Sequence, residues 1–184
     1  MKHTIWLLLI GIVFCFAKCG KEKPIDSNSN NIPGLPPATQ TGANTLGFLL
    51  NGVPWIPAGN NGTANLSIDF DPGISNGYVS IASYSSRLSN RSDIIIAVKD
   101  SLNFAIPPIT YKIGNIYNGF VLFTDNAYCE RRTTDTSTFS NGFITVTDFN
   151  RTIGIISGIF ECTIYNPACG DTVKITQGRF DMKF

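Results

Sequence analysis

The stretch ANLSIDFDPGISNGYVSIASY, residues 64–84, decides the fold class. In its first part Leu66, Ile68 and Phe70 are apolar, and the residues between them are polar. Alternation with a period of two is typical of a β-strand with one buried face. The DPGISNG segment is rich in turn-forming residues, and residues 78–84 return to strand-forming types. The stretch therefore predicts two strands joined by a turn.

Short strand patterns separated by turn signals continue through residues 44–184. Residues 45–57 predict a hairpin, because Asn51-Gly52 supplies the two positive-φ residues of a type I′ turn. Pro54 and Pro57 place its second arm at a sheet edge or make it leave the sheet early. No amphipathic helix of ordinary length follows residue 44. We therefore expect an all-β fold, an antiparallel β-sandwich of about nine to eleven short strands, with a β-barrel as the alternative.

The last expected strand, residues 172–184, changes phase along its length. Apolar residues stand at odd positions up to Ile175 and at even positions from Phe180 onward. Since a shift of one residue moves side chains to the other face, we expect a β-bulge near Gln177-Gly178. Outer-membrane barrels often end in a similar way, but the sequence lacks their regular ten-residue lipid-facing strands. We interpret this strand as the one that closes the domain.

The amino terminus combines a short cationic start with an apolar run over residues 4–17. This run is shorter than the ~20 residues that span a bilayer, and it is typical of a secretory signal peptide, here residues 1–18. Cys19 follows, and with Gly20 and a polar tail it resembles a bacterial lipobox, in which this cysteine receives the lipid. Cys19 is therefore the predicted lipidation site. The alternative is an uncleaved hydrophobic anchor.

Residues 19–43 are rich in Asn, Ser, Pro and Gly and have no apolar periodicity. Such a segment cannot bury enough surface to offset its conformational entropy, so we expect a disordered, flexible linker. The expected organisation is a signal peptide (1–18), a lipidated cysteine with its linker (19–43) and one β domain (44–184). It implies an outer-membrane-anchored lipoprotein of the cell envelope, either periplasm-facing or surface-exposed.

The net charge and the histidine content argue against several classes of function. The formal net charge is +1, and removal of residues 1–18 with Lys2 and Lys18 leaves about −1, so no nucleic-acid partner is expected. Arg131-Arg132 is the only basic pair, and we interpret it as solvated. The only histidine, His3, lies in the signal peptide, which argues against Ser-His-Asp and Cys-His catalysis and His-containing zinc sites. Phosphate-binding glycine motifs are missing, and we predict no cofactor and no metal site.

Two segments carry a family resemblance: LPPATQTGANTLGFLLNGVPWIP (35–57) and IISGIFECTIYNPACGDTVKITQGRFDMKF (155–184). Their phrases GANT, NG-x-x-W, ISG-x-F and GRFD together resemble the DUF6252 family of uncharacterised Bacteroidota lipoproteins, over about residues 35–184. The resemblance implies an extracytoplasmic lipoprotein with a β-rich domain and no established activity. It brings no catalytic residues with it.

Asp69 and Asp71 are the candidate carboxylates for an enzyme. They alternate onto one face of a strand, with Cα atoms roughly 7 Å apart, and glycosidases need two carboxyls about 5 to 10 Å apart. With Ser75 they also faintly resemble a calcium loop, although the bidentate Glu is missing. Any exposed Asp-x-Asp gives this spacing, so we interpret the pair as solvated residues that lead into a turn.

Aromatic residues are the candidates for a sugar-binding platform. In β domains such residues more often fill the core, with their polar tips hydrogen-bonded at its edge. We interpret the tryptophan, close to a tight turn and between prolines, as a plug at one end of the core. The candidates are Trp55, Tyr78, Tyr84, Tyr111, Tyr117 and Tyr128.

Three cysteines fall in the expected domain. Cys162 shares a strand face with apolar neighbours, which predicts a buried free thiol. In an oxidising compartment we expect Cys129 to pair with Cys169 and close a loop of about 40 residues. A Cys162–Cys169 bridge and the absence of any disulfide are the alternatives.

The sequence thus favours a lipid-anchored, non-enzymatic binding or structural module of the envelope. It does not identify the ligand, for which a glycan and an envelope protein are the candidates. A carboxylate-dependent enzyme acting on glycans is the alternative. The enzyme and the binding module would require different surface features. An enzyme needs a cleft with converging carboxylates and a perturbed pKa, whereas a binding module needs an apolar or aromatic surface without them.

Overall fold

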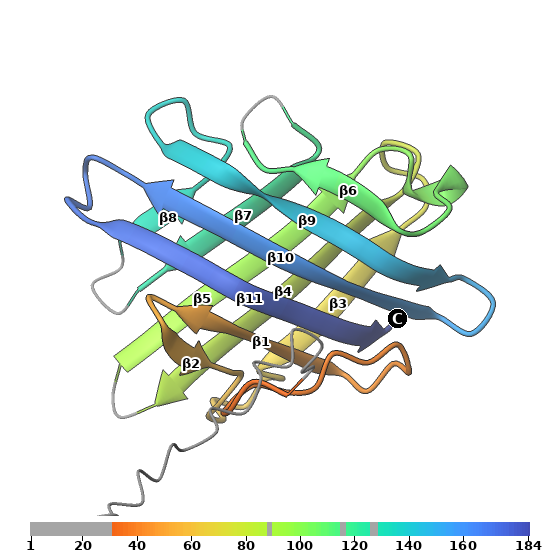
Figure 1. Cartoon of the computed structure of the whole chain (residues 1–184), viewed down its shortest axis with the longest axis horizontal. Coiled ribbons are helices and arrows are strands. Elements are labelled where there is room, and N and C mark those ends of the chain that lie inside the picture. Colours follow the sequence, from red (N-terminus) through yellow and green to blue (C-terminus); the bar gives the residue numbers. More distant parts are fainter. Residues whose placement is uncertain (1–30, 88–89, 115–116, 126–128) are drawn as a thin grey trace, which may run out of the picture.

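A computed structural model describes residues 31–87, 90–114, 117–125 and 129–184. These residues form eleven β-strands and one short 3-10 helix, Leu102–Phe104. The strands make two antiparallel sheets that pack face to face and cross at a clear angle (Figure 1). The predicted β-sandwich is confirmed, and neither sheet closes into a barrel. Residues 1–18 and Cys19 lie outside the described residues.

Sheet A has six strands in the order β2-β1-β11-β10-β9-β6. Their bounds are β1 Thr45–Leu50, β2 Val53–Trp55, β6 Ile109–Lys112, β9 Phe139–Asn150, β10 Ile155–Tyr165 and β11 Thr172–Lys183. Sheet B has five strands in the order β3-β4-β5-β7-β8. Their bounds are β3 Leu66–Asp71, β4 Tyr78–Arg87, β5 Asn90–Lys99, β7 Gly119–Thr124 and β8 Glu130–Arg132.

The β1–β2 hairpin follows from its turn residues. Asn51 and Gly52 have φ values of 49° and 85°, and both signs match a type I′ turn. β2 pairs only with β1 among the described strands and lies at the edge of sheet A. The predicted hairpin and its edge arm are therefore confirmed.

The expected bulge lies in β11. Phe160 of β10 pairs with Gly178, but Cys162 pairs with Ile175, so β11 carries one extra residue between these pairs. Gln177, within that interval, has a φ of 55°. The extra residue keeps both apolar halves of β11 on the inner face, where Ile175 and Met182 are buried.

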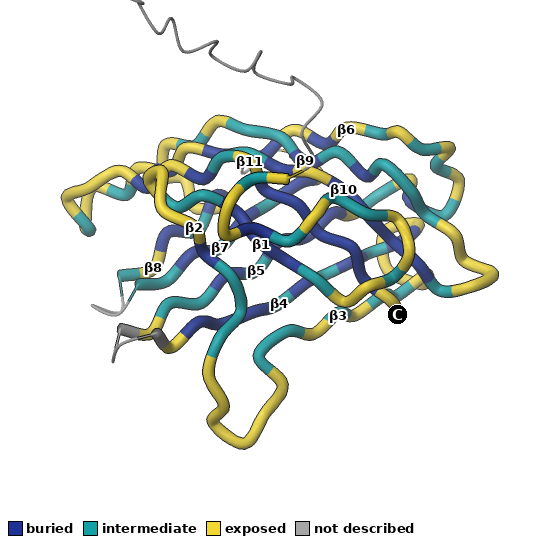
Figure 2. Tube along the Cα trace, turned by 60° about the horizontal axis from the view of Figure 1, so that its bottom comes forward, coloured by how far each residue is buried: buried dark blue, intermediate teal, exposed yellow. Residues whose placement is uncertain are grey.

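The core fills the space between the inner faces of the two sheets. Buried segments lie where the sheets face each other, and the connecting loops are mostly exposed (Figure 2). Phe48, Phe123 and Phe160 are among the largest side chains removed from solvent. Each such side chain contributes roughly 1.5–3 kcal/mol to folding. Within the described residues, no helix is both long and apolar enough to cross a bilayer.

Residues 35–43 pack against the sandwich. Leu35 is buried, and Thr39, Thr41, Gly42 and Ala43 all donate hydrogen bonds to one carboxylate of β11. Figure 1 places this segment beside β1, at the bottom of the view. The flexible linker expected over residues 19–43 therefore does not extend to residue 43, because these contacts attach the last part of that range to the folded domain.

Candidate functional site

A groove of about 880 Å³ opens between β3, at the edge of sheet B, and β1 of sheet A. The N-terminal segment forms part of one wall, and the end of β11 also contributes. The lining is mainly apolar and includes two asparagines and one lysine. The apolar contributors include Leu35, Pro36, Ile56, Leu66, Ile68 and Met182, and the polar ones include Asn44, Asn65 and Lys183.

The β3 wall follows from the alternating sequence. Leu66 and Ile68 turn toward sheet A and pack against the core, whereas Asp69 points outward and is exposed. Because β3 is an edge strand, its inward side chains are only half-buried. The result is an apolar surface that solvent or a ligand can reach.

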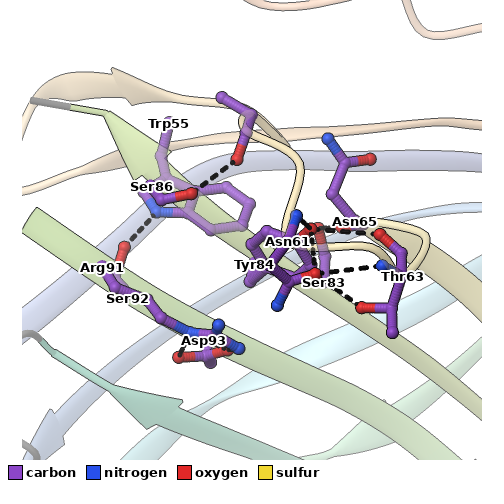
Figure 3. Close-up of polar contacts among 11 residues, drawn as sticks. Trp55, Asn61, Thr63, Asn65, Ser83, Tyr84, Ser86, Arg91, Ser92 and Asp93 are labelled. Carbon is purple, nitrogen blue, oxygen red and sulfur yellow. Dashed lines mark hydrogen bonds and ion pairs between the residues drawn. The ribbon is translucent and has the colours of Figure 1, made fainter. Parts of the chain in front are cut away.

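The loop before β3 is fixed by Tyr84 of β4 (Figure 3). The Tyr84 hydroxyl donates to Asn61 Oδ1 at 2.7 Å and lies 3.1 Å from the carbonyl oxygen of Thr63. Asn65 is held through its carbonyl oxygen, which accepts from Ser83 Oγ at 2.7 Å and from the Tyr84 amide at 3.0 Å. These bonds place Asn65 and the start of β3 at the groove.

The opposite wall depends on Asp181, a buried residue of β11. Its carboxylate accepts hydrogen bonds from Thr39 Oγ1 at 2.6 Å, Gly42 N at 2.8 Å and Ser157 Oγ at 2.8 Å. Burial alone would raise the pKa of Asp181, but hydrogen bonds from Thr39, Thr41, Ser157 and Gly42 outweigh it and hold the pKa well below its usual range. The carboxylate therefore fastens the segment that leads back to the groove wall.

Glycine allows that wall to approach the sheet. A Cβ at Gly47 of β1 would lie 2.5 Å from Pro36 Cδ and 3.3 Å from Ile56 Cγ2. Any side chain at this position would therefore require Pro36, a residue of the groove lining, to move.

The aromatic candidates do not form a platform. Trp55 is buried, stacks on Phe48 with ring centroids 4.6 Å apart, and donates its Nε1–H to Ser92 Oγ at 2.8 Å (Figure 3). Tyr84 is buried as well. Tyr111 is also buried, and burial together with the charge of Asp100 raises its pKa to about 12.

The remaining aromatic candidates lie elsewhere. Tyr78 is half-buried on β4, and Tyr117 is exposed near Lys112, whose ammonium lies 5.9 Å from the ring centroid. Tyr128 lies outside the described residues. None of the six contributes to the groove lining as described.

Asp69 and Asp71 are not brought to the groove. Asp71 Oδ1 accepts the Gly73 amide at 2.7 Å, so this carboxylate closes the turn that follows β3. Ser75 lies in the same turn with a φ of 48°. Across the described part of the chain, no group of three or more acidic, cysteine or histidine side chains is placed to hold a metal ion. Among the described residues, none that lines the groove carries a carboxylate.

The structure joins Cys129 to Cys169 and leaves Cys162 as a buried free thiol, as the sequence analysis predicted. Burial and the charge of Glu161 raise the pKa of Cys162 to about 12. Because a thiol must ionise to act as a nucleophile, burial makes Cys162 a poor nucleophile.

Arg131 differs from its expected solvated state. Its side chain is 1% exposed and lies between Asp125, at 3.0 Å, and Asp171, with which it forms a second ion pair. Its Nη1 also donates to the Cys129 carbonyl at 3.1 Å. Nε is buried without a hydrogen-bond partner among the described residues. Arg131 connects the two sheets beside the disulfide.

Loss of the Tyr84 hydroxyl tests how the groove is positioned. We expect Tyr84→Phe to lower the free energy of unfolding by about 1–2 kcal/mol, because Asn61 and Thr63 lose a partly buried partner. Amide hydrogen exchange of residues 61–65 should accelerate more than that of β9. Tyr165→Phe is the control, since this residue is exposed. Equal exchange in both variants would contradict the assigned role.

Comparison of the chain with protein-family models, with curated proteins and with solved structures found no match in any of the three. The function of the protein is therefore inferred from the groove.

Proposed function

We propose that this protein is a lipid-anchored binding module of the cell envelope and that the groove between β1 and β3 is its binding site. The observation that carries the proposal is the groove itself, an apolar concavity with a few polar residues and, among the described residues that line it, no carboxylate. Concave apolar surfaces with few polar groups are typical of ligand sites. Hydrolysis of a glycan would require converging carboxylates there.

The anchor is proposed at Cys19, and the protein is proposed to be similar to the DUF6252 lipoproteins. The described chain begins at residue 31, and Leu35 already lines the groove. The segment from Cys19 to residue 31 spans at most roughly 40 Å when fully extended. An anchor at Cys19 would therefore keep the groove close to the membrane surface. The Cys129–Cys169 disulfide supports an oxidising compartment outside the cytosol.

Binding of a neutral apolar dye, N-phenyl-1-naphthylamine, tests the groove. We expect saturable fluorescence enhancement with the unaltered protein. Ile68→Glu should weaken dye affinity at least tenfold, because it places a charge on the apolar β3 wall, and a tenfold loss corresponds to about 1.4 kcal/mol.

The matched control is Ile159→Glu, which makes the same change on a strand but outside the groove, at a residue that is 42% exposed. Thermal unfolding of both variants establishes that they are folded at the temperature of the titration. Equal dye affinity in the two folded variants would exclude the groove as the binding site.

A further inference from the structure

The free edge of β3 presents main-chain groups beside the groove. β3 pairs only with β4 among the described strands. The Tyr84 amide donates to the Asn65 carbonyl at 3.0 Å, so these directly opposed residues form a hydrogen-bonded pair. Bonded and non-bonded pairs alternate in an antiparallel ladder. Leu66 and Ile68, in the non-bonded pairs, therefore direct their N–H and C=O groups away from β4.

The same two residues face the groove with their side chains. A ligand at this edge would meet apolar side chains and main-chain donors and acceptors at a spacing of two residues. That combination matches an extended polypeptide, which adds to a sheet edge and places alternate side chains in an apolar surface.

Only the amino-terminal half of the β3 edge is open to pairing with another strand. Edge strands commonly carry charges and proline that discourage pairing, and Asp69, Asp71 and Pro72 serve this purpose at the carboxyl end of β3. Residues 65–68 carry no charge. The unprotected half is the half that lines the groove. A second copy fits poorly, because pairing two β3 strands would bring four carboxylates into one short ladder.

The charge of the groove lining indicates which charge the ligand should carry. Of the described residues that line the groove, Lys183 is the only charged one. Its main-chain N–H donates to Asn44 Oδ1 at 3.0 Å, and the ion pairs found among the described residues do not include its ammonium group. A carboxylate on the ligand complements this cation. A fatty acid would also meet Lys183, but it would leave the Leu66 and Ile68 main-chain groups without partners.

We infer that the groove binds an extended, apolar peptide that adds a strand to sheet B along residues 65–68 and places a carboxylate near Lys183. The inference rests on the proposed function and names the ligand class of the same site.

The test uses the purified protein and a synthetic probe, acetyl-Thr-Val-Thr-Val-Thr-Val with a free terminal carboxylate. Two derivatives carry N-methyl groups on alternate residues, either all three valines or all three threonines. N-methylation removes the donors on one side of an extended strand only. We expect one derivative to lose at least tenfold in affinity and the other to stay within threefold of the parent. Amide chemical shifts should move at residues 65–68.

The carboxylate is tested separately. The free-acid probe should bind at least threefold more tightly than its terminal amide, and Lys183→Met should remove that difference. Lys174→Met, which changes an exposed lysine outside the groove, should retain it.

Equal losses with both N-methylated probes would overturn the inference. So would the absence of any shift at residues 65–68 up to millimolar probe, or palmitate binding in the groove where the probe does not bind. Self-association through β3, detected by light scattering with shifts at the same amides in the absence of probe, would also overturn it. The groove as a binding site fails only if the dye fails to bind in it, so failure of the peptide inference and failure of the proposed binding site are distinguishable.

Discussion

Replacing both Cys129 and Cys169 with alanine is expected to lower the free energy of unfolding by about 4 kcal/mol. The disulfide closes a loop with a sequence separation of 40 residues, and a loop of this length loses roughly this much unfolded-state entropy on the chain-entropy model. Cys129 directly precedes β8 of sheet B, and Cys169 lies in the turn before β11 of sheet A. The bond therefore joins the two layers of the sandwich.

Neighbouring contacts depend on this bond. The Asn166 side chain donates to the Glu130 carbonyl at 2.9 Å, and Arg131 forms an ion pair with Asp171 across the same junction. These contacts join the same chain segments as the disulfide, so we expect them to weaken when the bond is lost.

Urea denaturation with and without a reductant checks this prediction. The unaltered protein should lose stability on reduction, and the double alanine variant should be insensitive to the reductant. A loss below about 1 kcal/mol for the double variant would show that the bond contributes little.

Replacing Asp181 with asparagine is expected to have the second largest effect, a loss of about 3 kcal/mol at neutral pH. The substitution keeps the shape of the side chain but turns one acceptor into a donor that faces Thr39, Thr41 or Gly42. Hydrogen bonds to a charged group contribute about 1.5–3 kcal/mol each, and partly buried donors left without acceptors add a further cost.

The stabilisation by the Asp181 carboxylate should decrease as the pH falls. Because the folded-state pKa of Asp181 is lowered, its stabilisation is fully present above the unfolded-state pKa near ~3.9 and is lost as pH falls toward the folded-state value. The difference in melting temperature between Asp181→Asn and the unaltered protein should therefore be largest above about pH 5 and narrow below pH 4.

Melting curves from pH 2 to 8 provide the measurement, with Asp69→Asn as a control at an exposed carboxylate. Faster amide exchange at Thr41, Gly42 and Ala43 should accompany the loss of stability. Weaker dye binding is expected too, since the same segment leads to the groove wall at Leu35. A melting-temperature difference that stays constant with pH would argue against the carboxylate as the fastening group.

Patterns within short stretches of the sequence predicted the structural features that depend only on neighbouring residues. The alternation through Phe70 predicted β3, Asn51-Gly52 predicted the hairpin, and the phase change in the last strand predicted the bulge beside Gln177. Each of these depends on neighbours within a few residues. The cysteine pairing followed from compartment and composition.

Features built from distant segments could not be predicted in this way. Asp181 binds residues about 140 positions earlier in the chain, so nothing in the composition of residues 35–43 signals their attachment. Arg131 is buried by Asp125 and by Asp171, 40 positions later, and a three-residue strand gives no periodicity that could have revealed it.

One wall of the groove could be predicted from the sequence, and the other wall could not. Its β3 wall follows from alternation, but the other wall combines residues 34–36 with the start of β1, residues 56–57 and the end of β11. Only the topology, with β3 at the edge of sheet B and β1 between β2 and β11 in sheet A, brings these segments together.

Intact-mass spectrometry of the protein extracted from its native membrane tests the central claim, that an acylated cysteine holds this binding domain at the envelope. We predict a chain that begins at Cys19, with a diacylglyceryl group on its sulfur and with Cys129 and Cys169 oxidised. A chain that retains residues 1–18 and carries no lipid on Cys19 would contradict the account.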